Sequence, residues 1–210
     1  MFDIIAIMEF EIILASASPR RKELLKKIIK NFRVVESGVD EGCISAAPPI
    51  LFAKNAAILK AKAVAVKYKK SIVIGADTIV VLGKKILGKP KDKKDAVAML
   101  KSLSDATHKA ITGIAVIFPG GKIVSDAAVT KIKMRKLSKK DILAYVNSGR
   151  PLDKAGAYGI QEIEDAFVEK IEGDYDNVVG LPVQKLKKIL LVEVETTSTT
   201  RKTGCLNLFF

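Results

Sequence analysis

The chain has 210 residues, 49% of them hydrophobic, and a formal net charge of +13 from 36 Lys and Arg against 23 Asp and Glu. This apolar fraction excludes a disordered chain, and the length is sufficient for one core, so a single globular domain is expected. The positive charge attracts anions such as nucleic acid, acidic lipid or phosphorylated metabolites, although a lysine-rich solvated surface would give the same excess.

The cysteines and the chain start bear on the compartment. Cys43 and Cys205 form neither a metal pattern nor a disulfide framework, which favours a reducing, cytoplasmic setting. The first residues include Asp3 and Glu9 and lack a basic region, so they do not resemble a signal peptide; Met8 is the expected initiator. No stretch approaches the roughly 20 apolar residues of a membrane span, so no membrane partner is expected.

The first third of the chain predicts two strands and two helices. An apolar run over residues 11–15 predicts a buried strand, and Ser18-Pro19 predicts the N-cap and first position of a helix. A second strand is expected at 32–35. An Ala- and Lys-rich segment predicts a long helix at about 50–70.

The middle of the chain is rich in strand signals. Residues 71–82 are strand-like, but Gly75-Ala76-Asp77-Thr78 is expected to interrupt them. A helix at 94–103 then precedes two long β segments at 109–118 and 122–134.

The last third predicts a helix at 138–147, a Gly-rich stretch at 149–159, a strand near 167–171 and a final helix at about 182–190. Helices alternate with strands, which predicts an α/β layered fold, and the paired β segments favour a mixed sheet.

Two hydroxyls and two guanidiniums gather at the first predicted strand-to-helix junction. Ser16, Ser18, Arg20 and Arg21 lie where free backbone N–H groups and the helix dipole favour an anion. One arginine guanidinium can donate hydrogen bonds to two phosphate oxygens at once, so this junction is a candidate phosphate-binding site. The alternative is a capped helix with two surface arginines.

Asp77 follows the apolar residues 72–74, and ligands bind at strand ends in α/β sheets. With a usual pKa of about 3.9, Asp is a poor base for bulk water. A metal that lowers the pKa of bound water to roughly 7 makes an Asp-plus-metal pairing chemically coherent. The alternative is an Asp that forms a turn.

Further candidates are Lys89, beside Pro90, and the stretch that contains Lys154 and Gln161. Glycines in that stretch let backbone approach a ligand closely, and Gln offers a donor and an acceptor to a base edge. The alternatives are a solvated surface lysine and a tight structural loop. His108, the single histidine, is expected to be a hydrogen-bonded structural residue.

Together, the stretches SASPRRKELL, GADT, GKPKDKKDAVAMLKSLS, THKAITG, DKAGAYGIQ and VVGLPV resemble the Maf family of nucleotide pyrophosphatases over roughly residues 12–190. The resemblance implies an elongated mixed α/β sheet flanked by helices, with two lobes around a deep cleft, related to the inosine-triphosphate pyrophosphatases. We therefore expect one catalytic domain over residues 1–194, followed by a polar tail over 195–210. A homodimer is also expected, because family members are often dimers.

The resemblance also implies roles for particular residues. Asp77 matches the catalytic acid-base residue, and Asp77 with Asp40, which precedes Glu41, is the expected ligand set of a divalent metal, Mg²⁺ or Mn²⁺. Whether Asp77 acts as base or metal ligand stays open. The residues expected to bind the triphosphate are Ser16, Ser18, Arg20, Arg21, Lys60, Lys89 and Lys154.

The combination of SPRR, GADT and GIQ is similar to the branch that hydrolyses dTTP and UTP, with Arg20, Thr78 and Gln161 as specificity positions. Modified pyrimidine nucleotides are further expected substrates, as a housecleaning role demands. Glu162 stands where the family usually has Gly, and its negative charge is expected to weaken triphosphate binding or alter base choice.

Two other functions compete with this interpretation. One is a purine-directed pyrophosphatase that removes ITP or XTP. The other is a nucleic-acid-binding or cell-division regulator that uses the basic surface without turnover. The chain has no Trp and no strand with interleaved aromatic and basic residues for stacking bases, which weighs against nucleic acid as a partner.

Overall fold

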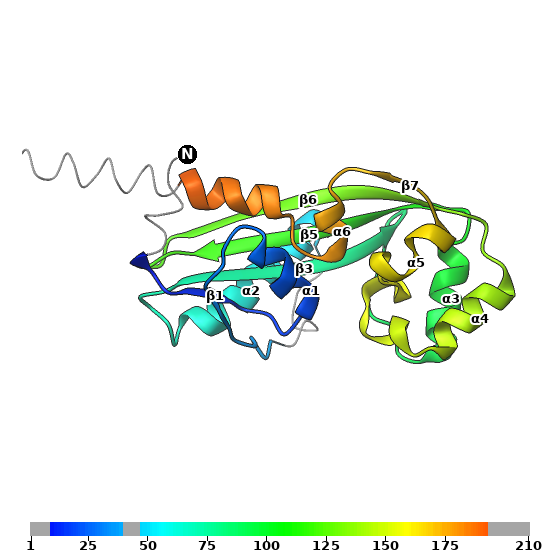
Figure 1. Cartoon of the computed structure of the whole chain (residues 1–210), viewed down its shortest axis with the longest axis horizontal. Helices are drawn as coiled ribbons and strands as arrows, with labels where there is room; N and C mark the ends of the chain where they lie inside the picture. Colours follow the sequence, from blue (N-terminus) through cyan, green and yellow to red (C-terminus); the bar gives the residue numbers. More distant parts are fainter. Residues whose placement is uncertain (1–8, 40–46, 193–210) are drawn as a thin grey trace, which may run out of the picture.

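The computed structural model describes residues 9–39 and 47–192 (Figure 1). The expectations for Asp40 and Glu41, for a start at Met8 and for the tail lie outside these residues. Across the described ranges, no helix has the length and apolar character needed to cross a bilayer.

The described strands belong to one mixed sheet. They are β1 (Ile12–Leu14), β2 (Arg33–Val34), β3 (Ile72–Leu82), β4 (Lys85–Leu87), β5 (Thr107–Ile117), β6 (Ile123–Met134) and β7 (Val168–Glu172). The order is β2-β1-β3-β5-β6-β7, and β4 forms a hairpin with β3. β1 is parallel to β2 and β3, and the other neighbouring strands are antiparallel, so the predicted mixed sheet is confirmed.

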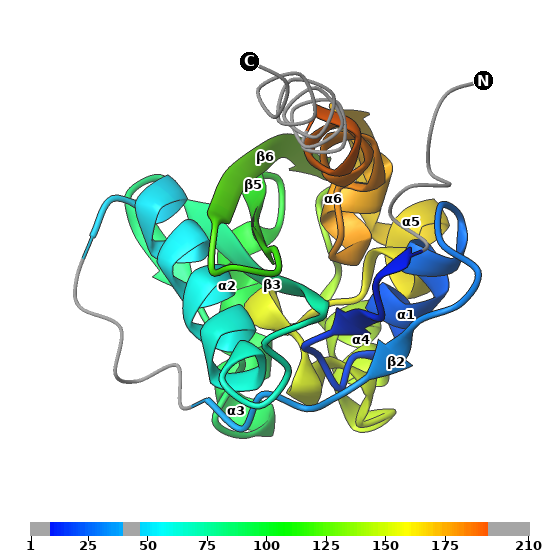
Figure 2. The same cartoon turned by 90° about the vertical axis from the view of Figure 1, so that its left-hand side faces the viewer.

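Helices flank this sheet on both faces. They are α1 (Pro19–Lys26), α2 (Pro49–Ala65), α3 (Lys93–Leu103), α4 (Lys139–Asn147), α5 (Ile160–Phe167), α6 (Tyr175–Val179) and a last helix over residues 183–192. The long strands β3, β5 and β6 run along the long axis of the molecule, with α3, α4 and α5 grouped at one end (Figure 1). Seen from the end, α2 lies on one side of the sheet and α1 and α6 on the other (Figure 2).

β3 continues without a break through Gly75-Ala76-Asp77-Thr78, so the predicted interruption is wrong. β5 pairs with β3 over its whole central part, and Asp77 lies opposite Gly113 in this ladder. Continuous pairing on one side keeps the backbone extended despite the glycine. Asp77 therefore lies in the middle of a strand rather than after its end.

The small residues of β3 and β5 are explained by the helix above them. A Cβ atom added at Gly75 would collide with the backbone oxygen of Ala57, and one added at Gly113 would collide with that of Ala53. Both alanines are buried on α2. The backbone of α2 thus lies directly on the sheet, which is possible only where side chains are absent beneath it.

The remaining predictions differ from the structure mainly at boundaries. The long helix predicted to residue 70 ends at Ala65, because the apolar positions that face the sheet stop at Val64. α5 and α6 were not predicted. α5 buries Ile160, Ile163 and Phe167, a helical spacing that the neighbouring glycines obscure.

His108 lies on β5 and is buried, with 1% of its surface exposed. Its Nε2 atom is 2.7 Å from the hydroxyl oxygen of Tyr158, as expected for a structural histidine. Burial lowers the pKa of His108 from 6.5 to about 4. The folded state therefore holds this imidazole neutral over a range in which the unfolded chain binds a proton.

This histidine predicts a loss of stability in mild acid. As the pH falls from 6.5 towards 4, protons bind the unfolded chain first, and the free energy of unfolding drops by about 1.4 kcal/mol per unit. Above pH 6.5 the contribution is fully present, and below pH 4 no more is lost. We expect the free energy of unfolding, measured with urea, to fall between about pH 7 and about pH 5 in the parent chain. In His108→Gln the same fall should be smaller by roughly 2 kcal/mol. Equal losses in both proteins would contradict this assignment.

Candidate active site

A cavity of about 530 Å³ opens where β3 lacks a neighbour on one side. β1 pairs with β3 only as far as Ile74, and β4 pairs with it only from Val80. Between these points β3 is bonded to β5 alone, so one edge of the strand faces the cavity. Within an α/β sheet, such a discontinuity between neighbouring strands is a favoured place for a ligand.

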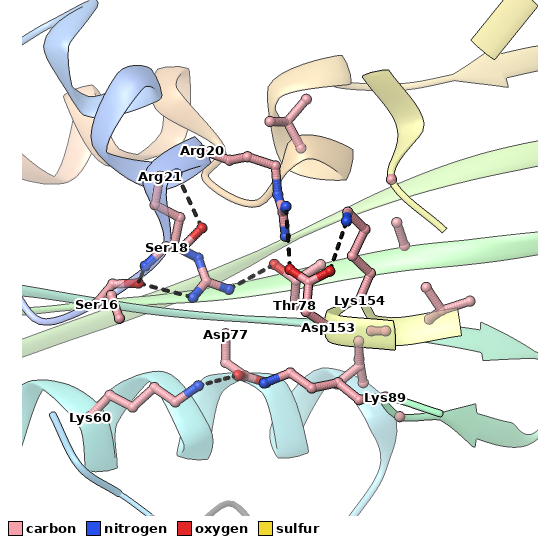
Figure 3. A pocket seen from close by; sticks show the side chains of 18 of the residues that line it. Ser16, Ser18, Arg20, Arg21, Lys60, Asp77, Thr78, Lys89, Asp153 and Lys154 are labelled. Atoms are coloured by element: carbon pink, nitrogen blue, oxygen red, sulfur yellow. Dashed lines mark hydrogen bonds and ion pairs between the residues drawn. The ribbon is translucent and has the colours of Figure 1, made fainter. Parts of the chain in front are cut away.

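The cavity brings together most of the side chains singled out in the sequence. They come from segments far apart in the sequence, from the residues just before α1 to the first turn of α5, and Figure 3 shows many of them around the cavity. Those that line it are Ser16, Ser18, Arg20, Arg21, Lys60, Asp77, Thr78, Lys89, Lys154 and Gln161. Asp40 lies outside the described residues.

Asp77 points to the α2 side of the sheet. Lys60 of α2 donates from Nζ to Oδ1 of Asp77 over 2.6 Å, and the two residues are only 8% and 4% exposed. Figure 3 shows the Lys89 side chain extending toward Asp77 from the side away from Lys60. The Lys60 ammonium offsets part of the cost of removing the Asp77 carboxylate from water.

Thr78 points to the opposite side, since successive side chains of a strand alternate between its faces. There its hydroxyl oxygen accepts from Nη2 of Arg21 over 3.1 Å. Arg21 also donates from Nη1 to Ser16 Oγ over 3.3 Å and from Nε to the Gly180 carbonyl oxygen over 2.9 Å. Each nitrogen of this guanidinium therefore has a protein acceptor that fixes its plane.

The start of α1 is capped as the sequence predicted. The Ser18 hydroxyl accepts from the Arg21 backbone N–H over 3.4 Å, and Pro19 occupies the first position of the helix. The positive end of the α1 dipole therefore faces the cavity next to Arg20 and Arg21.

Arg20 reaches across the cavity to Asp153, with 3.8 Å between Nη1 and Oδ2. Burial opposes ionisation of Asp153, but the hydrogen bond from Lys154 and the charges of Lys154 and Arg20 outweigh it and lower its pKa. The side chains of Arg20 and Asp153 are 35% and 67% exposed, so their ion pair is weak. A phosphate group can replace the carboxylate as the partner of Arg20.

Lys154 is nearly buried and has protein acceptors for its ammonium. It donates to Asp153 Oδ1 over 2.8 Å and to the Arg150 carbonyl oxygen, and Glu162 Oε1 lies 3.3 Å away. Glu162 Oε2 in turn accepts from the Tyr145 hydroxyl over 2.7 Å. The negative charge of Glu162 is therefore compensated by Lys154, whose position it helps to fix.

The sequence from 11 to 192 matches the family model described as Maf-like protein. The chain belongs to the Maf-like proteins. This membership confirms the resemblance found in the sequence motifs.

Named relatives agree with this membership. The dTTP/UTP pyrophosphatase of Thermosipho africanus is 49% identical over 180 residues, covering 86% of this Maf-like chain and 92% of the relative. The protein of the same name from Dictyoglomus turgidum is 48% identical over 185 residues, covering 87% and 96%. A solved HAM1 protein from Coxiella burnetii has a similar fold, with a TM-score of 0.50 at 16% identity over 89% of this chain and 99% of that one.

The oxygen donors of this Maf-like chain bear on the expected metal. Within residues 9–39 and 47–192, no group of three or more His, Cys, Asp or Glu side chains could hold an ion. The carboxylates of Asp77 and Glu36 do line the cavity. Because Mg²⁺ is commonly held by one or two carboxylates together with substrate phosphates and waters, these donors fit a metal that enters with a triphosphate, and they do not form a protein cage.

Three residues that support the Maf-like site from outside its lining were not singled out in the sequence. Thr112 and Asn177 are fully buried polar residues, and Gly180 supplies the carbonyl that holds Arg21. A signal was available for Thr112, which is a lone polar residue inside the apolar run AITGIAV, whereas Asn177 follows the polar residues Asp174 to Asp176. Buried polar groups require partners, so such residues indicate a hydrogen-bond network.

Proposed function

We propose that this chain is a nucleoside triphosphate pyrophosphatase that hydrolyses dTTP and UTP to the monophosphate and pyrophosphate. The observation that carries the proposal is the buried Asp77 carboxylate in a cavity that Arg20, Arg21, Lys60 and Lys89 also line. A triphosphate is the common metabolite whose charge matches such a set of cations. The names of the relatives, which share nearly half of the sequence, support the same activity.

Residues on the two sides of β3 have different roles in the proposed reaction. On the Thr78 side, Arg21, Ser16 and the start of α1 bind phosphate oxygens through a fixed guanidinium and backbone N–H groups. On the Asp77 side, Lys60 and Lys89 compensate the charge that grows on the departing pyrophosphate. Catalysis of this kind depends mainly on positioning and electrostatics.

The reaction itself centres on Asp77. Its carboxylate orients a water molecule and accepts a proton as the water oxygen bonds to the α-phosphorus. The bond from that phosphorus to the oxygen bridging the β-phosphate breaks, and pyrophosphate leaves. Asp77 and Glu36 are the residues that would hold a divalent metal, which would supply Lewis-acid polarisation and lower the pKa of the attacking water.

We assign the selection of the nucleobase to Thr78, Gln161 and Arg20, which line the same cavity. A neutral hydroxyl and a neutral amide suit the mixed donor and acceptor edge of thymine or uracil. Modified pyrimidine nucleotides are substrates in the same proposal, consistent with a housecleaning role. We also propose that the protein forms a homodimer, which the family resemblance supports and light scattering tests. A cytoplasmic setting is part of the same proposal and is supported by the cysteine usage.

A nucleotide panel tests the activity. The chain is incubated with dTTP, UTP, CTP, ITP and XTP in ¹⁸O-labelled water, with Mg²⁺ or with Mn²⁺, and both products are identified. We expect the highest kcat/KM for dTTP and UTP, the label in the monophosphate, and no turnover after chelation with EDTA. A preference for ITP or XTP would contradict the pyrimidine assignment, and release of orthophosphate would contradict the cleavage position.

A further inference from the structure

A chain of hydrogen bonds runs from the cavity into the buried part of the sheet. It starts at Arg21, whose Nη2 donates to the Thr78 hydroxyl over 3.1 Å. The Thr78 and Thr112 hydroxyl oxygens are 2.9 Å apart. Thr112 Oγ1 then donates to the backbone carbonyl oxygen of Asn177 over 2.8 Å.

The groups at the two ends of this series of hydrogen bonds determine which atom donates in each bond. A carbonyl oxygen only accepts, so the single hydroxyl proton of Thr112 is directed to Asn177. Thr78 must therefore donate its own proton to Thr112. At the other end a guanidinium only donates, so Thr78 accepts from Arg21. As a result, the Thr78 hydroxyl oxygen can accept a hydrogen bond from a ligand in the cavity, but it has no proton left to donate to that ligand.

Asn177 also acts on the other side of the Arg21 guanidinium, through the helix α6 that ends at Gly180. Its Oδ1 accepts from the Thr112 backbone N–H over 3.1 Å, and its Nδ2 donates to the Ala110 carbonyl and to Thr130 Oγ1 over 3.1 and 2.9 Å. These bonds join α6 to β5 and β6. Gly180 at the end of α6 then presents its carbonyl to Arg21 Nε at 2.9 Å.

Gly180 is suited to this place by its backbone. Its φ of +133° lies where side chains are rarely tolerated, and an added Cβ would lie 3.5 Å from Arg21 Nε and 3.6 Å from Thr78 Oγ1. The carbonyl that holds Arg21 is thus oriented by the turn that ends α6, which in turn depends on Asn177.

We propose that Thr112 and Asn177 are positioning residues for triphosphate binding. They orient Arg21 through Thr78 on one side and through Gly180 on the other, and neither belongs to the described lining of the cavity. The inference rests on the proposed function in one respect, namely that Arg21 binds the triphosphate. A fully hydrogen-bonded buried network favours one arrangement of its members, so Arg21 is held in its binding geometry before substrate arrives.

A series at residue 112 tests this proposal. Thr112→Val keeps the shape but removes the hydroxyl, Thr112→Ser keeps the hydroxyl, and Thr112→Cys supplies a weaker donor. Ile114→Val is the control, because Ile114 is a fully buried neighbour on β5 without a hydroxyl. Melting temperatures identify any variant that does not fold, and the Ser and Cys variants keep the series decisive if the Val variant is lost.

Two measurements are made on each variant. The first is the exchange of the Arg21 Nε–H proton with water in the ligand-free protein by NMR, with the resonance assigned by its loss in Arg21→Lys. The second is the kinetics of dTTP hydrolysis. Thr112→Val should raise both the exchange rate and the KM by roughly tenfold with little change in kcat, since the hydrogen bonds of its hydroxyl to Thr78 and to the Asn177 carbonyl are lost. Thr112→Ser should resemble the parent chain, and Thr112→Cys should fall between them.

The outcomes separate this inference from the proposed function. If Thr112→Val matches Ile114→Val in both exchange and KM, the positioning role is wrong. If the parent chain does not hydrolyse dTTP, the proposed function fails, and the exchange of the Arg21 proton alone then decides whether Thr112 orients the guanidinium.

Discussion

Asp77→Asn should lower the turnover of dTTP by a factor on the order of 10²–10⁴, because the amide cannot accept a proton or carry the charge that orients the attacking water. The substitution is nearly isosteric. In the parent chain the Lys60 ammonium lies 2.6 Å from an Asp77 carboxylate oxygen. In the variant it faces a neutral amide instead. Steady-state release of pyrophosphate from dTTP measures the loss, and circular dichroism reports whether the fold is kept.

Asp126→Asn provides the matched control for this experiment. Asp126 on β6 also accepts from a lysine over 2.6 Å, in this case Lys185, but it is absent from the described lining of the cavity. The same chemical change at Asp126 should leave dTTP turnover within about threefold of the parent, as expected for a surface ion pair. Near-parental turnover by Asp77→Asn would remove Asp77 from the reaction.

Gly113→Ala should destabilise the protein by about 3 kcal/mol, the upper part of the range for overpacked cores. The new methyl group would collide with the Ala53 carbonyl of α2 and would lie 2.6 Å from the Lys54 backbone nitrogen. These are backbone atoms, so relief requires α2 to move away from the sheet. For a chain of this size, the melting temperature should fall by roughly 6–12 °C.

Gly88→Ala is the control for this prediction, since an added Cβ there has no atom within 4 Å and φ lies outside the left-handed region. It should melt within about 2 °C of the parent chain. A Gly113→Ala protein with an unchanged melting temperature would show that α2 adjusts freely. The contact of α2 with the sheet would then not be what places Lys60 beside Asp77.

The packing of α2 connects stability to the site. Lys60 lies on the same buried face of α2 as Ala57 and Ala61, and those alanines meet the sheet at Gly75. The close approach made possible by small residues on both elements brings the Lys60 ammonium within hydrogen-bond distance of Asp77. Substitutions that lift α2 should therefore impair both the fold and the reaction.

Local signals in the sequence predicted several parts of this protein. Ser18-Pro19 marked the start of α1, since a hydroxyl followed by proline satisfies the demands of a helix start without any tertiary contact. The motif residues were also recognisable as a set, and those that fall within the described residues line one cavity. Asp40 remains a prediction.

Other parts were not accessible to local reasoning. Gly75-Ala76-Asp77-Thr78 looked like a break, because nothing in the sequence reveals that β5 pairs alongside and that α2 needs the space. α5 was hidden for a similar reason, since its burial depends on which face meets the core. The compensation of Glu162 by Lys154 depends on the turn between them, which places the two side chains 3.3 Å apart.

The sequence by itself determined the family, the mixed α/β class and the residue types that we propose to bind phosphate, because these follow from motifs and from local periodicity. Only the tertiary structure decided that Asp77 and Thr78 lie on opposite sides of one strand, at the edge left open between β1 and β4. It alone also decided which partners hold Arg21. Both are properties of pairing between segments far apart in the chain, and such pairing is selected by the packing of the whole core.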